Sequence, residues 1–214
     1  MTGFIDVAGP LNAVVYVPRQ PVREGLPAVL FLHGRGECGT DGRRQLTHGP
    51  AKDAIEHPER WPALVVMPQK PDFDAPWSHF RSELNDLLGL VDARWRPGSH
   101  RAISGLSQGG RGALELGGRL DWRFDRVAAI CGWVEDDSAL PLLEGKNVWL
   151  FHGDQDTVVP PSGSLEVAAR LRELGGEPRV TIFEGVGHDA WTPAFADGSL
   201  AAWLAADYPA NLAR

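Results

Sequence analysis

Short apolar runs alternate with longer amphipathic segments along the chain. Most of the apolar runs are continuous, without polar residues at every second position, which is typical of strands that are buried on both faces in the middle of a parallel sheet. The apolar runs predict strands at residues 13–17, 28–33, 64–68, 100–104, 127–131, 147–152 and 179–184.

The segments between these runs carry apolar residues at steps of three and four, the spacing of one helix face. Within residues 81–95 this face consists of Leu84, Leu87, Leu88, Val91 and Trp95. The same spacing predicts helices at 109–120, 164–174 and 195–206, and Gly175-Gly176 supplies a C-terminal stop for the middle one. Strands that alternate with helices predict an α/β fold with a mainly parallel central sheet flanked by helices.

Residues 34–50 break the alternation. They follow the most apolar run, and residues 33–42 read His-Gly-Arg-Gly-Glu-Cys-Gly-Thr-Asp-Gly, which is too rich in glycine for a regular element. We therefore expect a loop at the carboxyl end of a strand. In open α/β sheets, ligands bind at that edge.

Length and composition narrow the classes of function. A chain of 214 residues with 43% hydrophobic and 23% charged residues, without an internal repeat, predicts a single domain over residues 1–214. The net charge of -7 disfavours binding to nucleic acid or to an anionic membrane. No apolar run approaches the roughly 18 residues of a membrane span. The same charge makes a small-molecule substrate the expected partner. The N-terminus lacks a signal-peptide pattern, so we expect a cytoplasmic protein.

The sequence also predicts neither a cofactor nor a metal. Cys38 and Cys131, the 2 cysteines, are too far apart for a metal-binding spacing, and idle thiols are the simplest interpretation. No phosphate-binding loop, dinucleotide motif or histidine cluster with metal spacing occurs. A homodimer is compatible with the sequence, which neither favours nor excludes it.

A candidate nucleophile lies in the pentapeptide Gly105-Leu-Ser-Gln-Gly109, which matches G-x-S-x-G. A predicted strand enters the pentapeptide and a predicted helix leaves it, as the motif requires. A serine on so sharp a turn needs small neighbours two residues away, and glycine meets that need. The turn points the Ser107 hydroxyl away from the sheet and places the backbone N–H of Gln108 at a helix N-terminus, where an oxyanion is stabilised.

A serine hydroxyl also needs a base and an acid that orients the base, and on this type of sheet the chain order is serine, acid, histidine. Of the 7 histidines, only His188 follows the loop at residues 152–160, which holds Asp154 and Asp156. The spacing alone does not separate the two carboxylates. We favour Asp156, because Asp154 beside Gly153 is suited to accepting backbone N–H groups in a turn.

Together these stretches resemble α/β-hydrolases of the small phospholipase/carboxylesterase type, and they are also similar to bacterial predicted esterases and peptidases related to dienelactone hydrolase. The resemblance covers nearly the whole chain. The matching stretches are residues 32–37 for the oxyanion loop, 105–109 for the nucleophile turn, 152–160 for the acid loop and 187–188 for the histidine loop.

The resemblance implies a role for each matched residue. It makes Ser107 the nucleophile, His188 the base and Asp156 the acid, and it independently selects Asp156 over Asp154. It gives the oxyanion hole to the backbone N–H groups of Arg35 and Gln108. Dienelactone hydrolases use a cysteine nucleophile, whereas Ser107 occupies that position here, so we do not expect their substrate.

The substrate pocket is less defined by the sequence. Trp77, Trp133 and Trp191 each follow a strand or a catalytic loop, and we predict that they form the pocket wall. Residues 132–146 are too few for a helical cap. The acidic residues at 135–137 would disfavour anionic substrates if they bordered the site, and the sequence does not place them.

These observations predict a serine carboxylesterase that hydrolyses small to medium esters through an acyl-enzyme. A peptidase or aminoacyl-amide hydrolase of the same fold is the nearest alternative. A binding protein without catalysis, which uses the same cleft for a small molecule, is an alternative of another class.

Overall fold

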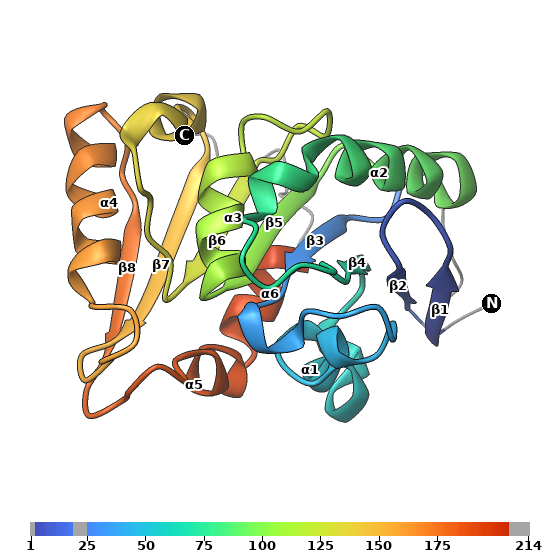
Figure 1. Cartoon of the computed structure of the whole chain (residues 1–214), viewed down its shortest axis with the longest axis horizontal. Helices are drawn as coiled ribbons and strands as arrows, with labels where there is room; N and C mark the ends of the chain where they lie inside the picture. The colour runs from blue at the N-terminus through green and yellow to red at the C-terminus, as the bar shows by residue number, and fades with distance from the viewer. Residues whose placement is uncertain (1–2, 19–24, 206–214) are drawn as a thin grey trace.

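The computed structural model describes residues 3–18 and 25–205. Eight strands form one twisted sheet in the order β1-β2-β4-β3-β5-β6-β7-β8, which runs from right to left in Figure 1. The strands are β1 (Gly3–Val7), β2 (Ala13–Val17), β3 (Ala28–Leu32), β4 (Leu64–Pro68), β5 (Arg101–Leu106), β6 (Arg126–Ile130), β7 (Asn147–Gly153) and β8 (Arg179–Phe183).

The predicted parallel centre of the sheet is confirmed. Strands β4, β3, β5, β6, β7 and β8 are parallel to one another, whereas β2 pairs antiparallel with both β1 and β4. Strand β1 was not predicted. It is an edge strand whose residues are exposed or partly buried apart from Val7, so it lacks the continuous apolar run that marks the central strands.

Helices cover both faces of the sheet (Figure 1). The α-helices are α1 (Pro50–Glu56), α2 (Arg81–Trp95), α3 (Gln108–Leu116), α4 (Ser162–Glu173), α5 (Trp191–Ala196) and α6 (Ser199–Ala205). The 3-10 helices are η1 (Arg35–Glu37), η2 (Arg44–Leu46), η3 (Pro58–Arg60), η4 (Trp77–Phe80) and η5 (Asp137–Leu143).

The core forms two layers, one on each face of the sheet. Helices α2, α3 and α4 pack into the first layer, and α1, α5 and α6 pack into the second. Successive residues of a central strand point to opposite faces of the sheet and pack into opposite layers. In β3, Leu30 lies in the first layer and Phe31 in the second. Burial of both strand faces explains the continuous apolar runs in the sequence.

Two helix predictions were wrong in extent. The helix predicted at 195–206 is two helices, because Gly198 adopts a φ of 74° and the Asp197 side chain accepts a hydrogen bond from Ser199 N; residue 206 lies outside the described residues. The helix predicted at 109–120 ends at Leu116, where two glycines follow. Residues 34–50 are mostly loop, as expected, with η1 and η2 inside them.

The loops that matter for function leave the carboxyl ends of the parallel strands. Residues Gly34, Ser107 and Cys131 follow β3, β5 and β6, and the predicted acid and histidine loops follow β7 and β8. All of these loops therefore meet at one edge of the sheet. Within residues 3–18 and 25–205, no helix combines the length and apolar character needed to cross a bilayer.

Candidate active site

Ser107 occupies the sharp turn between β5 and α3. Its φ of 52° and ψ of -119° make it one of the few residues other than glycine with a positive φ. This backbone conformation costs on the order of 1–3 kcal/mol in a residue with a side chain and occurs mainly at functional sites. The turn brings the Ser107 hydroxyl out of the sheet and into a cavity.

The glycines around Ser107 make this turn sterically possible. A Cβ atom at Gly109 would collide with the carbonyl oxygen of Leu32, and one at Gly105 would collide with the carbonyl oxygen of Gly109. A Cβ atom at Gly110 would lie 2.7 Å from the carbonyl oxygen of Ile130. Helix α3 therefore approaches the neighbouring strands so closely that only glycine fits at its start.

The structure brings Ser107, His188 and Asp156 together from the ends of three strands. His188 Nε2 lies 3.0 Å from Ser107 Oγ, and His188 Nδ1 lies 2.7 Å from Asp156 Oδ2. Because the carboxylate only accepts hydrogen bonds, Nδ1 carries the proton and Nε2 accepts the serine proton. An imidazole placed in this way can act as a general base toward the hydroxyl.

Asp156 is buried and its carboxylate is fully engaged. Oδ1 accepts hydrogen bonds from Val158 N and Val159 N, each at 2.9 Å, while Oδ2 accepts the bond from His188. Burial raises the pKa of the Asp156 carboxyl, but these hydrogen bonds outweigh it, so that its pKa lies below the usual value. The group therefore stays ionised beside the imidazole.

The neighbouring carboxylate serves a different purpose. Asp154 is exposed, and its Oδ1 accepts a hydrogen bond of 2.7 Å from Gly185 N. This contact joins the loop after β7 to the loop after β8. The geometry thus places Asp156, and not Asp154, against His188. Asp189, the residue after His188, accepts hydrogen bonds from Thr192 at the start of α5.

The predicted oxyanion donors also border the cavity. Arg35 and Gln108 line it together with Ser107, and their backbone N–H groups form no hydrogen bond within the described residues. Gln108 is the first residue of α3, so its N–H lies at the positive end of the helix dipole. Free N–H groups beside a nucleophile are suited to an oxyanion.

His33 supports the loop that carries Arg35. Its Nδ1–H donates to Gly34 O at 2.6 Å, and its Nε2 accepts a bond of 2.9 Å from Lys70 N. Burial lowers the pKa of His33 to about 4, so the ring is neutral at physiological pH, as these two bonds require. His33 thereby ties the end of β3 to the end of β4.

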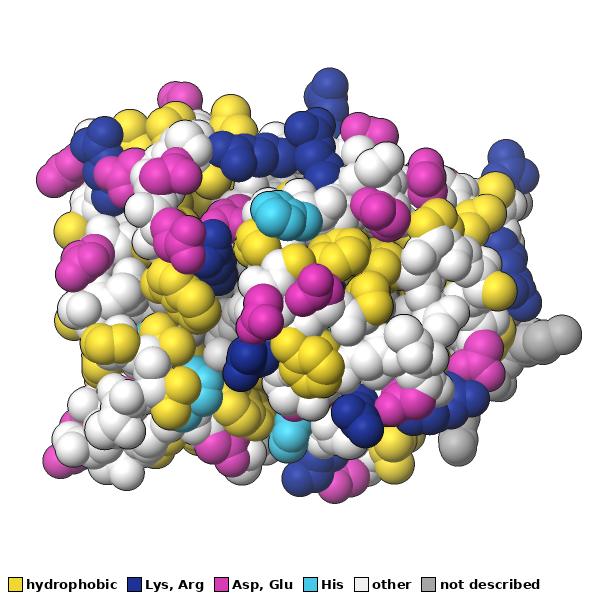
Figure 2. Space-filling model, in the orientation of Figure 1, with side chains coloured by type: hydrophobic (Ala, Val, Ile, Leu, Met, Phe, Trp, Pro, Cys, Tyr) yellow, Lys and Arg dark blue, Asp and Glu magenta, His cyan; other side chains and the backbone are white. Residues whose placement is uncertain are grey.

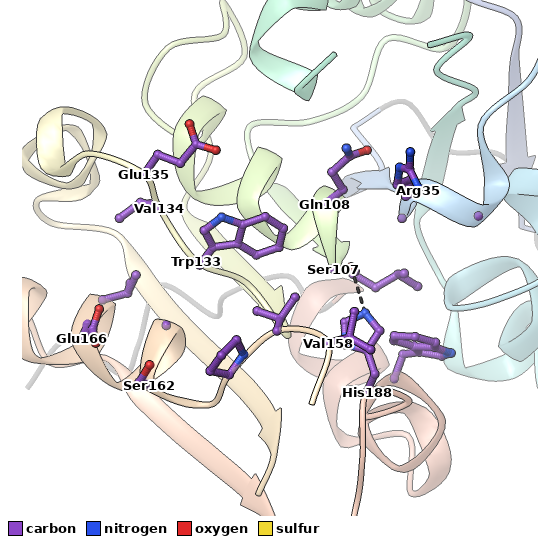
Figure 3. Close-up of a pocket in the computed structure, with 18 of the residues that line it drawn as sticks. Arg35, Ser107, Gln108, Trp133, Val134, Glu135, Val158, Ser162, Glu166 and His188 are labelled. Carbon is purple, nitrogen blue, oxygen red and sulfur yellow. Dashed lines mark hydrogen bonds between the residues drawn. The ribbon is translucent and has the colours of Figure 1, made fainter. Parts of the chain in front are cut away.

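A single groove of about 1110 Å³ runs away from the serine (Figure 3). Ser107 and His188 lie at one end, Trp133 and Val158 flank the middle, and Glu135 and Glu166 lie toward the other end. The groove is large enough for a drug-sized ligand. Its wall combines apolar side chains with charged side chains of both signs.

Two of the three predicted pocket tryptophans line this groove. Trp133 and Trp191 are half-buried and border it. The prediction for Trp77 was wrong: its side chain is 1% exposed, lies in the first core layer and donates a hydrogen bond of 3.0 Å from Nε1 to His33 O. Trp77 fills the space beside Gly112 of α3, and it therefore supports the site from within the core.

The acidic stretch that the sequence did not place does border the groove. Glu135 and Asp137 line it, whereas Asp136 turns aside and accepts a hydrogen bond from Ser138 N. Glu166 of α4 also lines the groove and was not singled out from the sequence, because it lies on the polar side of a helix. Only the packing of α4 beside the acid loop reveals its position.

The charges on this side of the molecule are mixed. Arg111 pairs with both Glu115 and Glu135, and Arg170 pairs with Asp137 and Glu173. On the face seen in Figure 2, acidic and basic side chains are interspersed with apolar ones, and neither sign of charge forms a continuous field.

One group of potential metal ligands lies among the described residues. The ligand atoms of Cys131, His152 and Asp156 lie within 4.8 Å of one another, and all three residues are buried. Asp156 already has hydrogen-bond partners at both of its oxygens. The cluster shares Asp156 with the candidate triad, and it was not predicted from the sequence.

The fold and the site define an α/β-hydrolase. The profile of the phospholipase/carboxylesterase family matches residues 70–199, more than half of the chain. The protein therefore belongs to the phospholipase/carboxylesterase family. No curated protein matches the sequence.

Solved structures agree with this assignment. A thermostable esterase is 25% identical, with a TM-score of 0.75 over 94% of this chain and 61% of that one. Esterase PE8 is 24% identical, with a TM-score of 0.64 over 90% of this chain and 98% of that one. The acylaminoacyl peptidase of Pyrococcus horikoshii is 16% identical, with a TM-score of 0.65 over 88% of this chain and 38% of that one. The last two show a shared fold.

Proposed function

We propose that the protein is a serine carboxylesterase that hydrolyses small to medium esters through an acyl-enzyme. The observation that carries the proposal is the continuous contact from Ser107 Oγ to His188 Nε2 at 3.0 Å and from His188 Nδ1 to Asp156 Oδ2 at 2.7 Å. This arrangement lies at the end of a groove that has room for a substrate.

In the first half of the reaction, Ser107 Oγ attacks the ester carbonyl carbon while its proton passes to His188 Nε2. The carbonyl oxygen becomes an oxyanion and accepts hydrogen bonds from the N–H groups of Arg35 and Gln108. The ester C–O bond then breaks, and His188 returns the proton to the departing alcohol. Asp156 keeps the imidazole oriented and stabilises its protonated form.

In the second half, a water molecule gives a proton to His188 and attacks the acyl-serine. The bond between the acyl carbon and Ser107 Oγ breaks, the serine recovers its proton, and the carboxylic acid leaves. The apolar residues Trp133, Val158 and Trp191 beside the serine support an apolar substituent on the substrate. The proposal extends to a single α/β-hydrolase domain over residues 1–214, which the shared sheet between both core layers supports.

Labelling with a fluorophosphonate probe tests the proposal directly. We expect the probe to modify Ser107 in the wild type, and Ser107→Ala to abolish the labelling and lower ester turnover on the order of 10⁴- to 10⁶-fold. Ser82→Ala is the matched control, because Ser82 is exposed on α2. Turnover that survives in Ser107→Ala would refute the serine mechanism.

A substrate panel separates the alternatives. Nitrophenyl esters from acetyl to palmitoyl report the acyl length, and an aminoacyl amide beside the ester of the same acyl group reports peptidase activity. Likeness to an acylaminoacyl peptidase is what motivates the amide. A wild type that binds these compounds but neither hydrolyses them nor reacts with the probe would support the non-catalytic alternative.

A further inference from the structure

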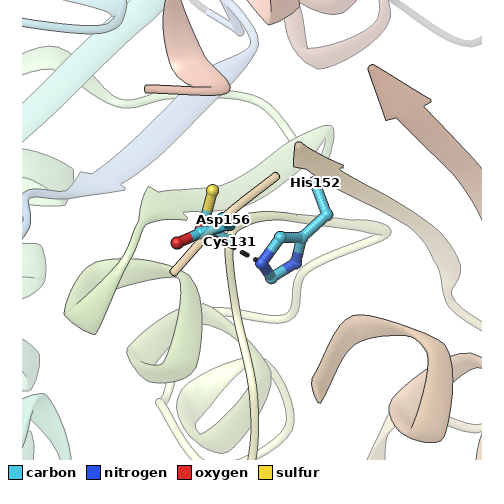
Figure 4. A group of neighbouring side chains, drawn as sticks. All are labelled: Cys131, His152 and Asp156. Carbon is cyan, nitrogen blue, oxygen red and sulfur yellow. Dashed lines mark ion pairs between the residues drawn. The ribbon is translucent and has the colours of Figure 1, made fainter. Parts of the chain in front are cut away.

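A second histidine lies behind the acid of the proposed triad. His152, in β7, is 0% exposed and takes no part in the reaction described above. Its Nε2 lies 2.9 Å from Val159 O and 3.3 Å from Asp156 Oδ2. Its Nδ1 lies 2.7 Å from Ser164 Oγ. Figure 4 shows the ring directed toward the Asp156 carboxylate.

These partners determine where the His152 proton lies. Val159 O and the Asp156 carboxylate only accept hydrogen bonds, so Nε2 must carry a proton. The Ser164 hydroxyl can donate a hydrogen bond to Nδ1, and Gly132 O lies 3.1 Å from the same hydroxyl. The contact with Ser164 involves Nδ1 alone and leaves Nε2–H in place. The arrangement always directs an N–H toward the acid loop.

This N–H acts on the acid by two routes. It fixes the carbonyl of Val159, the same residue whose backbone N–H donates to Asp156 Oδ1. It also presents its positive end to Oδ2, the oxygen that accepts the bond from His188. Asp156 therefore lies between two imidazole rings, one facing the serine and one facing the core.

Cys131 completes the surroundings of the carboxylate. The titratable groups that lie against Asp156 within the described residues are His188, His152 and Cys131. Burial raises the pKa of the Cys131 thiol to about 12, so the sulfur keeps its proton and lies 3.3 Å from His188 O as a donor. Cys131, His152 and Asp156 are thus joined through hydrogen bonds to their surroundings and form a buried polar network.

We propose that His152 is a positioning residue of the catalytic site, which holds Asp156 and its loop in the geometry that orients His188. The inference rests on the proposed function, because positioning has a measurable effect only if His188 is the base. Without the Nε2–H of His152, the carboxylate loses a contact that fixes its Oδ2. The carboxylate is then held less firmly against His188 Nδ1, which lowers the rate, and the charge of Oδ2 is no longer shared with a second N–H, which favours protonated His188.

A matched pair of variants tests this role. Gln can place an amide N–H near the position of Nε2, whereas Met has a similar length and no donor. We expect His152→Met to lower kcat on the order of 10- to 100-fold with KM changed by about twofold or less. The acid limb of kcat/KM should move to higher pH by roughly half a unit. His152→Gln should restore most of the rate and the pH profile.

Nitrogen-15 spectra of the wild-type imidazoles provide a test that needs no variant. We expect His152 Nε2 to be protonated across the pH range of activity. A bare Nε2, or a folded His152→Met that keeps the wild-type kcat and pH profile, would overturn the proposal. An absence of ester turnover in the wild type would count against the proposed function alone, because the spectra decide the hydrogen-bond arrangement independently.

Discussion

The two ends of the groove are built in different ways. At the reactive end, Ser107, Asp156 and His188 make contacts of 3.0 Å or less, and Asp156 is buried. At the acidic end, Glu135 and Glu166 are exposed. At the reactive end, strand ends and hydrogen bonds therefore fix the positions of the functional side chains. At the acidic end, the carboxylates belong to long side chains that lie in water.

This difference has an energetic consequence. A charge held in a buried network interacts strongly with its neighbours, whereas an exposed charge is screened by water and salt. Single substitutions should therefore have large effects on activity at the reactive end and small, salt-dependent effects at the acidic end.

Replacement of Asp156 should give the largest effect. In Asp156→Asn the side chain loses its charge and no longer favours the tautomer with a proton on His188 Nδ1, so we expect kcat to fall on the order of 10⁴-fold. Ester turnover of the purified variant measures this effect. The fold should persist, because the amide oxygen can still accept from Val158 N and Val159 N.

Asp154→Asn is the matched control two residues away. Its amide oxygen can keep the bond from Gly185 N, and the exposed site tolerates the change, so kcat should stay within about threefold of the wild type. A large loss in Asp154→Asn together with a small loss in Asp156→Asn would reverse the assignment of the acid.

The reactive end was largely predictable from the sequence because the constraints on its residues are visible in the residue types and in their order along the chain. The glycines around Ser107 are required by close backbone contacts, and such contacts leave a mark in the sequence. The order of Ser107, the acid loop and His188 follows from strands that end at one edge of the sheet. Spacing alone left both carboxylates open, and we favoured Asp156 because Asp154 beside Gly153 is suited to a turn; the resemblance to a family selected Asp156 independently.

The acidic end was not predictable because it depends on packing between distant segments. Glu166 lies on an ordinary amphipathic helix, and only the docking of α4 brings it beside residues 133–137. The prediction for Trp77 was wrong for the same reason. A tryptophan after a strand can face either the site or the core, and the packing of Trp77 against Gly112 places it in the core. Likewise, the sequence indicates only a buried strand residue at His152, and its contacts with the acid loop depend on the packing of that loop.

His33, which supports the oxyanion loop, should have a smaller effect, and this effect is on the pH dependence of the free energy of unfolding. Its pKa is lowered by burial from 6.5 to about 4, so the unfolded chain binds a proton at a pH where the folded protein does not. The contribution of neutral His33 to the stability of the folded protein is complete above pH 6.5 and is lost as the pH falls toward 4. Between about pH 7 and pH 5 the loss from this group should be about 2 kcal/mol.

Urea unfolding at these two pH values measures the loss. In His33→Gln the side chain does not titrate, so this part of the pH dependence should disappear, even though the variant is less stable near pH 7. His79→Gln is the control, because His79 is exposed and should leave the slope as in the wild type. An unchanged slope in His33→Gln would contradict a neutral, buried His33.

The smallest effect is expected at the acidic end of the groove. Within the described residues Glu166 has no ion-pair partner, whereas Glu135 is paired with Arg111 and Asp137 with Arg170. The negative charge of Glu166 should therefore disfavour an ester whose acyl chain ends in a carboxylate, relative to a neutral ester of equal length. Glu166→Gln should reduce this preference in kcat/KM by about twofold to threefold at low salt.

Salt makes the test specific. Because the Debye length shortens to about 3 Å at 1 M salt, the difference between Glu166→Gln and the wild type should vanish there. Glu184→Gln is the control, since Glu184 is exposed and does not line the groove. A preference that persists in Glu166→Gln, or that resists high salt, would mean that shape rather than charge selects the substrate at this end.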